Sequence, residues 1–423
     1  MALDRRALIG ALGLGVAAST ASARAQEQGP GPQPELSERI AARARENRHR
    51  LEYDGARFSG PAWDLLLSEG QSSHFFCIGE EHGIAENPKL AAQLFGALAP
   101  SGYVKACVEI SPPMAAELDR AARSGVEGLR QLFADRRANV AFFGMREEAE
   151  WIAAARTAAP GEGQAIWGLD YEVGGLGRLI DTLRAKPKPA AARAALDAVA
   201  AQETDLWAQY SETRNPQFIY SFAGDPALVR ALRDAWPDAD ADANWMLATL
   251  EETLAVNRLW VTNEGWASNE RRARFNRANF RRYWEAETRK PKVMFKFGAS
   301  HMVRGLSHTQ VFDIGAQISE TAEAIGASSF HVMVLPGAGA QVAQFDPSAW
   351  TSRPSDAGAY EDQGMGPLVS AAHPDAMTLI DLRPIRPLVF GRRHKALDAD
   401  LVRTIHGFDA LLVMSGSTPS ANL

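Results

Sequence analysis

A series of short, continuous apolar runs, separated by helical stretches, is the feature that most constrains the fold of this chain. The runs span residues 74–79, 104–110, 164–169, 292–298, 330–335, 377–381 and 410–414. A strand that is apolar throughout is typical of a parallel sheet covered on both faces, whereas a strand with one solvated face alternates apolar and polar residues. We therefore expect an α/β fold with a mainly parallel sheet flanked by helices and right-handed crossovers between its strands.

One long stretch, residues 178–288, interrupts this alternation of strands and helices. It contains no good strand pattern, and its helical patterns span residues 181–210, 225–236, 242–260 and 268–287. We therefore expect a helical insertion between two core strands. Such an insertion can act as a lid that closes over a site and excludes water, or it can be a helical layer without a gating role.

The first 25 residues have the pattern of an export signal. Arg5 and Arg6 precede an apolar run over residues 7–18, and an A-x-A sequence ends at Ala25, as in a cleaved signal peptide. The run is shorter than the roughly 20 residues that span a bilayer. The paired arginines resemble a twin-arginine signal, and a general secretory signal is the alternative. The mature protein is expected to be periplasmic or secreted, without a stable membrane span.

The rest of the chain divides into a short leading segment and one domain. Residues 26–51 are expected to form a linker followed by a charged surface helix over 36–51, and residues 52–418 are expected to form the α/β domain. The net charge of −6 indicates no broad basic face, so a nucleic-acid partner is not expected.

The two cysteines, Cys77 and Cys107, lie in apolar runs that we expect to be adjacent strands. A cysteine in a core strand usually acts as a small hydrophobic residue, so we interpret both as buried free thiols. The alternative is a disulfide, which an oxidising compartment permits if the two Cα atoms approach within about 7 Å.

Histidines and carboxylates stand at the ends of four of the apolar runs. Glu80 and His82 follow the first run, Glu109 lies at the end of the second, Asp170 follows the third and His301 follows the fourth. Because the carboxyl ends of parallel strands meet at one edge of a sheet, where ligands bind, we expect these side chains to form one site.

Two histidines with several carboxylates permit two chemistries. One is a metal site, in which His82, Glu80, Glu109 and His301 are the candidate ligands and Mn, Zn, Co or Fe is the divalent metal. The other is metal-free catalysis, in which a neutral histidine takes a proton from water while a carboxylate fixes its tautomer. The sequence leaves both open. It contains no G-x-S-x-G nucleophile motif, P-loop or H-E-x-x-H motif.

Two G-x-x-H motifs carry a resemblance to a known superfamily. They are Gly79-Glu80-Glu81-His82 and Gly298-Ala299-Ser300-His301, and each follows a core strand. Paired motifs of this kind resemble the group that joins erythromycin esterases, ChaN-like haem-binding lipoproteins and TraB/TIKI proteins. The order of elements is similar over residues 52–418.

Three further features are most similar to the erythromycin esterase branch. The segment 79–86 resembles that branch's G-E-x-x-H-G-x-x-E signature, with one residue fewer between Glu80 and His82. The arginine- and asparagine-containing segment 271–279 precedes the His301 strand, and Phe408-Asp409-Ala410-Leu411-Leu412 is similar to the branch's C-terminal strand.

The resemblance implies a hydrolase of ester or amide bonds, with a small-molecule substrate and macrolide lactones as one substrate class. It implies that His82 activates water or binds a metal, and that Glu80 and Glu109 orient His82 or hold the water. His301 would polarise the substrate carbonyl or bind metal, with Asp170 as a secondary member. Arg274 would bind an anionic group or the oxyanion, unless it is a solvated surface arginine. Two alternatives follow from the other branches: a haem- or iron-binding protein, and a TIKI/TraB-like metalloprotease.

Overall fold

The computed structural model describes residues 34–134, 141–161, 163–358, 364–391, 395 and 397–423. The predicted signal peptide and the first part of the predicted linker lie outside the described residues. Within the described ranges, no helix is both long enough and apolar enough to cross a membrane.

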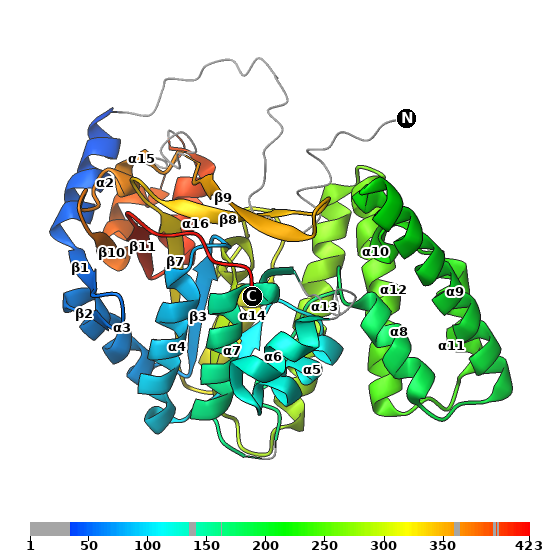
Figure 1. The fold of residues 1–423 in the computed structure, drawn as a ribbon. Coiled ribbons are helices and arrows are strands. Elements are labelled where there is room, and N and C mark those ends of the chain that lie inside the picture. Colours follow the sequence, from blue (N-terminus) through cyan, green and yellow to red (C-terminus); the bar gives the residue numbers. More distant parts are fainter. Residues whose placement is uncertain (1–33, 135–140, 162, 359–363, 392–394, 396) are drawn as a thin grey trace.

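A nine-stranded, mostly parallel sheet forms the centre of the fold, as the apolar runs predict (Figure 1). Its parallel strands lie in the order β11 (Ala410–Met414), β7 (Ser329–Pro336), β3 (Phe75–Glu80), β6 (Lys292–Gly298), β4 (Tyr103–Val108) and β5 (Ile166–Gly168). The sheet continues beyond β11 through antiparallel strands β10 (Met377–Asp381), β1 (Arg48–Tyr53) and β2 (Phe58–Ser59). All seven predicted strands are therefore present.

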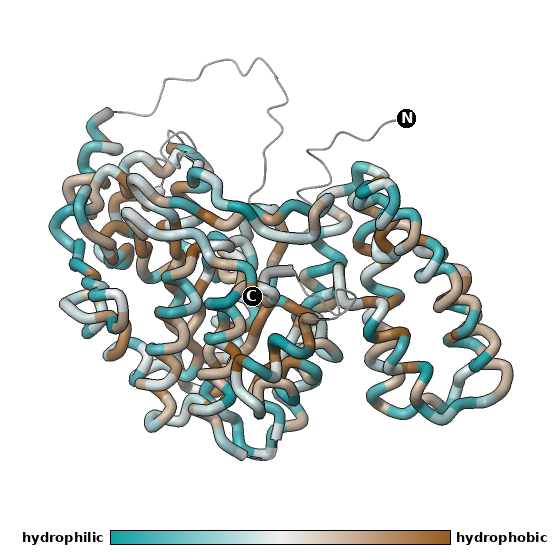
Figure 2. Tube along the Cα trace, viewed as in Figure 1, coloured by the Kyte–Doolittle hydropathy of each residue, from teal (hydrophilic) through white to brown (hydrophobic). Residues whose placement is uncertain are grey.

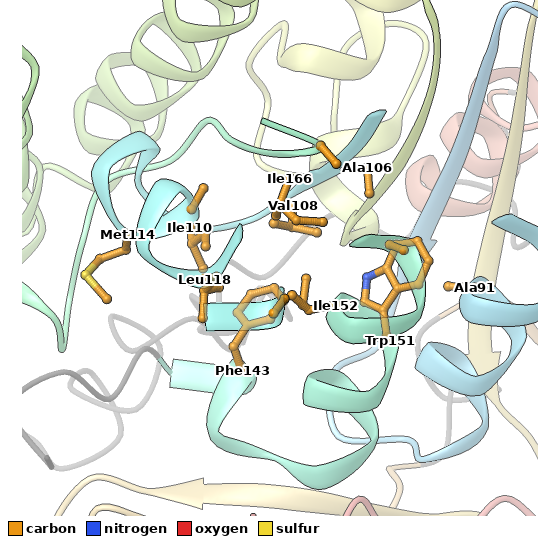
Figure 3. Close-up of a cluster of buried hydrophobic side chains, with 14 of the residues drawn as sticks. Ala91, Ala106, Val108, Ile110, Met114, Leu118, Phe143, Trp151, Ile152 and Ile166 are labelled. Carbon is orange, nitrogen blue, oxygen red and sulfur yellow. The ribbon is translucent and has the colours of Figure 1, made fainter. Parts of the chain in front are cut away.

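Helices cover both faces of the sheet, because the strands bury side chains on both sides. One face packs against α3 (Pro61–Ser72), α4 (Glu86–Leu98), α5 (Pro112–Ala122), α6 (Gly125–Ala134) and α7 (Arg146–Ala158). The other packs against α2 (Pro34–Glu46), α13 (Gly265–Ala286), α14 (Ile314–Ala324), α15 (Gly366–Val369) and α16 (Ala399–Gly407). Figure 3 shows part of the first core, where Val108 and Ile166 of the sheet lie near Leu118 and Ile152 of the helices.

The helical insertion lies between β5 and β6, as predicted. It consists of α8 (Leu176–Ala185), α9 (Ala190–Thr213), α10 (Tyr220–Ala223), α11 (Pro226–Ala235), α12 (Ala241–Val261) and α13. Pro187 and Pro189 separate α8 from α9, so the helix predicted over 181–210 is two helices. Figure 2 shows hydrophobic and hydrophilic residues mixed along these helices.

The structure differs from the sequence prediction at the N-terminal side of the domain. The helix expected over 36–51 ends at Glu46, and the following residues form β1, which pairs with β10. In β1 the side chain of Leu51 is buried while Arg50 and Glu52 are exposed, so this strand alternates as an outer strand does. Charged residues on both segments hid the boundary.

A second, two-stranded sheet was not predicted. Its strands are β8 (Gln341–Asp346) and β9 (Thr351–Asp356), which pair antiparallel. The hairpin connects the main body to the insertion, because the hydroxyl of Tyr210 on α9 donates a hydrogen bond of 2.8 Å to the carbonyl of Pro347. Trp350, directly before the second strand, packs near Trp207 and Tyr210.

The two cysteines are free thiols, as predicted, but their strands are not adjacent. β6 lies between β3 and β4, and Cys77 and Cys107 are both in register with Phe295. Two strand spacings separate the two Cα atoms by about 10 Å, which is beyond the reach of a disulfide. The expectation of neighbouring strands was wrong, and this geometry excludes the disulfide alternative.

Candidate functional site

The site lies at the carboxyl edge of four neighbouring strands. Glu80 is the last residue of β3, and His82 follows two residues later. Glu109 follows β4, Asp170 follows β5, and His301 lies in the 3-10 helix Ala299–Met302 after β6. All five side chains are buried. The structure therefore brings these five predicted residues into one buried cluster.

Glu109 is the centre of this cluster. Its Oε2 accepts a 2.6 Å hydrogen bond from the backbone N–H of Gly298 and lies 3.4 Å from Nε2 of His82. Its Oε1 lies 3.4 Å from Nε2 of His301 and accepts a 2.6 Å bond from Arg272. Burial opposes ionisation of Glu109, but the charges and hydrogen bonds of His301 and His82 hold its pKa well below the usual range.

The other nitrogen of each imidazole is held by a second carboxylate. Nδ1 of His82 lies 3.1 Å from Oε1 of Glu80, and Nδ1 of His301 lies 2.7 Å from Oδ2 of Asp313. Burial alone would lower the pKa of both rings. The carboxylates outweigh it and raise the pKa of His82 and of His301 to about 10. The carboxylates therefore favour the protonated form of both rings.

Asp313 is a site residue that sequence reasoning missed. It caps the N-terminus of α14, where its Oδ1 accepts a hydrogen bond of 2.7 Å from the N–H of Ile314. Its other oxygen is the one that faces His301. An aspartate directly before a helical pattern is a recognisable N-cap signal, although that signal says nothing about which histidine the free oxygen meets.

Arg272, and not the predicted Arg274, reaches the cluster. The Nε of Arg272 donates to Oδ1 of Asp170 at 2.9 Å, and the same guanidinium also bonds Glu109. The Arg274 side chain is 71% exposed and pairs with Glu270 on its own helix. Two residues along a helix turn the side chain by roughly 200°, so the two arginines point to opposite sides of α13. Arg274 thus has the exposed position that the solvated alternative describes.

The face of α13 that carries Arg272 docks on the end of β5. Nδ2 of Asn279 donates a 2.7 Å bond to the carbonyl of Leu169. The side-chain amide of Asn276 lies 3.1 Å from that carbonyl and from Oδ1 of Asp170, and both contacts are hydrogen bonds when its nitrogen faces them. Arg272, Asn276 and Asn279 are spaced four and three residues apart, which places them on one helix face. The spacing was visible in the sequence.

A buried lysine contacts the cluster from β6. Nζ of Lys296 donates to Oε1 of Glu80 and to Oε1 of Glu148 on α7, each at 2.6 Å. Neither Lys296 nor Glu148 was among the predicted site residues. The available signal was a charged residue inside the apolar run 292–298, because lysine is almost never fully buried without a partner.

Part of the cluster has the composition of a metal site. Glu109, Asp170 and His301 each offer one buried ligand atom, and these atoms lie within 4.8 Å of one another. His82 and Glu80, which were predicted as ligands, are not in this set. The guanidinium of Arg272 donates to both carboxylates of the set and supplies the positive charge there. These three groups could therefore hold a metal ion only in competition with Arg272, which donates to the same carboxylates.

The arrangement of His82 and His301 does not fit an axial ligand of haem. Both nitrogens of His82 and both nitrogens of His301 lie within 3.4 Å of a carboxylate oxygen. An axial histidine needs one ring nitrogen directed at the iron, and here each nitrogen faces a carboxylate.

No known family model and no curated protein matches the sequence. Solved structures do match. A mutant of erythromycin esterase EreC in its open conformation has a TM-score of 0.57 and 14% identity, over 89% of this chain and 98% of that one. A succinoglycan biosynthesis protein has a TM-score of 0.57 and 13% identity, over 92% and 99%. The haem-binding ChaN of Campylobacter jejuni has a TM-score of only 0.29 at 10% identity, over 68% of this chain and 91% of that one, which is too low to indicate a shared fold. The erythromycin esterase fold is thereby confirmed.

Proposed function

We propose that this chain, which has the fold of erythromycin esterase, is a hydrolase that adds water to an ester bond, a lactone included, or to an amide bond. One observation carries the proposal. The Nε2 atoms of His82 and His301 face different oxygens of Glu109, each at 3.4 Å, while both Nδ1 atoms are held by other carboxylates. Two oriented imidazoles beside one carboxylate can move a proton at one ring and stabilise a charge at the other.

In this proposal the neutral form of His82 is the general base, so the raised pKa of the ring means that it must first lose the proton on Nε2. Its Nε2 takes a proton from a water molecule, and the hydroxide attacks the acyl carbon of the substrate. His301, which carries a proton on Nε2, donates a hydrogen bond to the carbonyl oxygen as negative charge develops there. The bond to the leaving oxygen or nitrogen then breaks, and the leaving group takes the proton back from His82.

The carboxylates and Arg272 have supporting roles. Glu80 and Asp313 fix the orientation of the two rings, as the third member of a catalytic triad does. Glu109 lies between the rings, where it can hold the attacking water. Arg272 compensates the charge of Glu109 and Asp170. It comes from α13, so the helical insertion contributes to the site, and the lid role of the insertion is part of this proposal.

The position of Arg272 favours metal-free hydrolysis over a TIKI/TraB-like metalloprotease. The four carboxylate contacts of the imidazoles favour hydrolysis over a haem- or iron-binding protein. The substrate is a small molecule, and macrolide lactones are one class to test.

We also propose that the protein is exported through the twin-arginine or general secretory machinery and works in the periplasm or outside the cell. The paired arginines, apolar run and A-x-A site in residues 1–25 support this. N-terminal sequencing of the exported protein should begin at Gln26. A mature protein that keeps residues 1–25 would contradict the export proposal.

The hydrolase proposal is tested with a panel of esters, lactones and amides, with each product identified by mass spectrometry as the substrate plus one water. We expect turnover by the wild type and a loss of roughly 100-fold or more in His82→Asn and Glu109→Gln. Arg274→Ala is the matched control, because this side chain is exposed on the same helix as Arg272. Equal turnover by wild type and His82→Asn would reject the proposed base.

A further inference from the structure

Lys296 is an unusual residue for its position. It lies on β6, between β3 and β4 in the middle of the sheet, and its side chain is 3% exposed. Its neighbours along the strand, Phe295 and Phe297, are fully buried on the opposite face. A buried ammonium loses its hydration, and it is retained only where partners compensate that cost.

Two carboxylates compensate Lys296, and one of them is the partner of the proposed base. Oε1 of Glu80 accepts from Lys296 at 2.6 Å and is the same oxygen that lies 3.1 Å from Nδ1 of His82. The second carboxylate, Glu148, comes from α7 on the far side of Lys296 and binds it at 2.6 Å. The contacts form one chain of buried groups from Glu148 through Lys296 and Glu80 to His82.

The shared oxygen links the lysine to the ring geometry of His82. Within the described part of the chain, Oε2 of Glu80 and Oε2 of Glu148 have no hydrogen-bond partner. The orientation of the Glu80 carboxylate is therefore set at one oxygen, by Lys296 and His82 together. Without Lys296 the buried carboxylate would keep only its contact with the ring, and a carboxylate held at a single point can rotate.

We infer that Lys296 and Glu148 are positioning residues for the proposed hydrolysis: Lys296 fixes Glu80 against His82, and Glu148 fixes and balances Lys296. This inference rests on the proposed function, because it assigns the pair to the base of that reaction. The alternative role of the same contacts is purely structural, namely attachment of α7 to the sheet. The two roles predict different results when the pair is removed together.

Charged groups reach His82 from several elements, and the experiment must account for all of them. They are Glu80 on β3, Glu109 after β4, Arg272 on α13, His301 after β6, Lys296 on β6 and Glu148 on α7. Only the last two are changed in the test, so the direct partners of the ring stay in place.

The test replaces the pair with apolar residues, in the double variant Lys296→Met/Glu148→Leu. Replacement of a buried ion pair by apolar residues of similar volume is often neutral or stabilising. Glu80 loses Lys296 but keeps His82 at 3.1 Å as its partner, so the protein is expected to fold. A positioning role predicts a fall in kcat on the order of 10- to 100-fold with an unchanged KM. Wild-type kcat in a folded double variant would overturn the inference.

The matched control is the pair of Lys105 and Glu287, whose Nζ and Oε1 lie 2.6 Å apart at the other end of β4. Lys105→Met/Glu287→Leu removes the same charges away from the site and should leave kcat unchanged. A double-mutant cycle tests whether Lys296 acts through Glu80. If Lys296 acts through that carboxylate, Lys296→Met should lower kcat in the wild type and cause little further loss in Glu80→Gln. Full additivity would contradict the inference.

Glu148→Gln keeps the inference testable if the double variant does not fold. A negative charge near His82 favours the protonated ring, so its removal should shift the rise of kcat/KM to lower pH. Loss of the group that fixes Lys296 should also lower kcat on the pH-independent plateau, and wild-type plateau kcat in a folded Glu148→Gln enzyme would reject the inference.

One readout does not need activity. The Nδ1–H proton of His82, assigned by its loss in His82→Asn, should change its NMR shift in the double variant and not in the Lys105/Glu287 control. A wild type that hydrolyses nothing while this shift still responds would reject the proposed function alone. An unchanged shift would reject the positioning of His82.

Discussion

Gly298 borders the space between His82, Glu109 and His301, and a single methyl group placed there should change activity more than stability. A Cβ on this residue would lie 3.1 Å from Nε2 of His82 and 3.3 Å from Oε2 of Glu109. It would also lie 3.7 Å from Cδ2 of His301. A methyl group at Gly298→Ala therefore enters the space in which we place the attacking water.

The effect on folding should be small. The backbone of Gly298 has φ −54° and ψ 141°, which alanine adopts without strain. Replacing glycine at such a position gains about 0.4–1 kcal/mol from the unfolded chain, and the tight contacts cost about 1–3 kcal/mol. The net cost in the free energy of unfolding should therefore lie between about 0 and about 2.6 kcal/mol.

The effect on catalysis should be larger. Displacing water or a ring by about 1 Å can cost on the order of 100-fold in rate, which corresponds to about 2.7 kcal/mol of transition-state stabilisation. The assay compares kcat/KM with the free energy of unfolding from urea titration. Gly305→Ala is the control, since a Cβ there meets nothing within 4 Å. A folded Gly298→Ala enzyme with kcat/KM within twofold of the wild type would refute the placement of the water.

Three further predictions follow from the same cluster. The pKa of His82 is raised to about 10, so kcat/KM should rise with pH up to about 10, and a plateau reached below pH 7 would contradict this direction. The protonated ring also stabilises the fold. That stability is fully present below the unfolded pKa of roughly 6.5 and is lost as pH rises through 10. Arg272→Met leaves the carboxylates of Glu109 and Asp170 buried without their cation and should lower the free energy of unfolding by about 3–5 kcal/mol, against about 0.5 kcal/mol or less for Arg274→Ala in the same urea titration. Dialysis against a chelator should leave the hydrolysis rate unchanged. A loss of rate that one added divalent metal restores would show that a cation replaces Arg272 at the carboxylates of Glu109 and Asp170.

The strand-end residues could be predicted from the sequence because one rule of sheet geometry places them. Four apolar runs followed by Glu80, Glu109, Asp170 and His301 need only be parallel neighbours for those side chains to meet. The exact strand order was not needed for this result. It was needed for the cysteines, and there the prediction of adjacent strands failed because β6 inserts between β3 and β4.

The residues that were missed depend on contacts between elements that periodicity does not fix. Choosing Arg272 over Arg274 requires knowing which side of α13 faces β5, and six arginines on one helix obscure that side. The pairing of Lys296 with Glu148 requires the packing of α7 on β6. Asp313 reaches His301 through a 12-residue separation whose loop path no local pattern specifies.

Gly83, next to His82, is hydrogen-bonded to chain segments that lie far along the sequence. Its carbonyl accepts 2.9 Å hydrogen bonds from the N–H groups of Ala343 and Ser420, and nearby Glu86 holds Thr418 across 332 positions. Its φ of +86° and the carbonyl of Ala343, 2.4 Å from where a Cβ would lie, leave room only for glycine. Contacts of such long sequence separation form late, after the local helices. During refolding, helical circular dichroism should therefore recover before the proposed hydrolysis does. The lag between the two signals measures the time that these distant segments need to dock on the loop around His82.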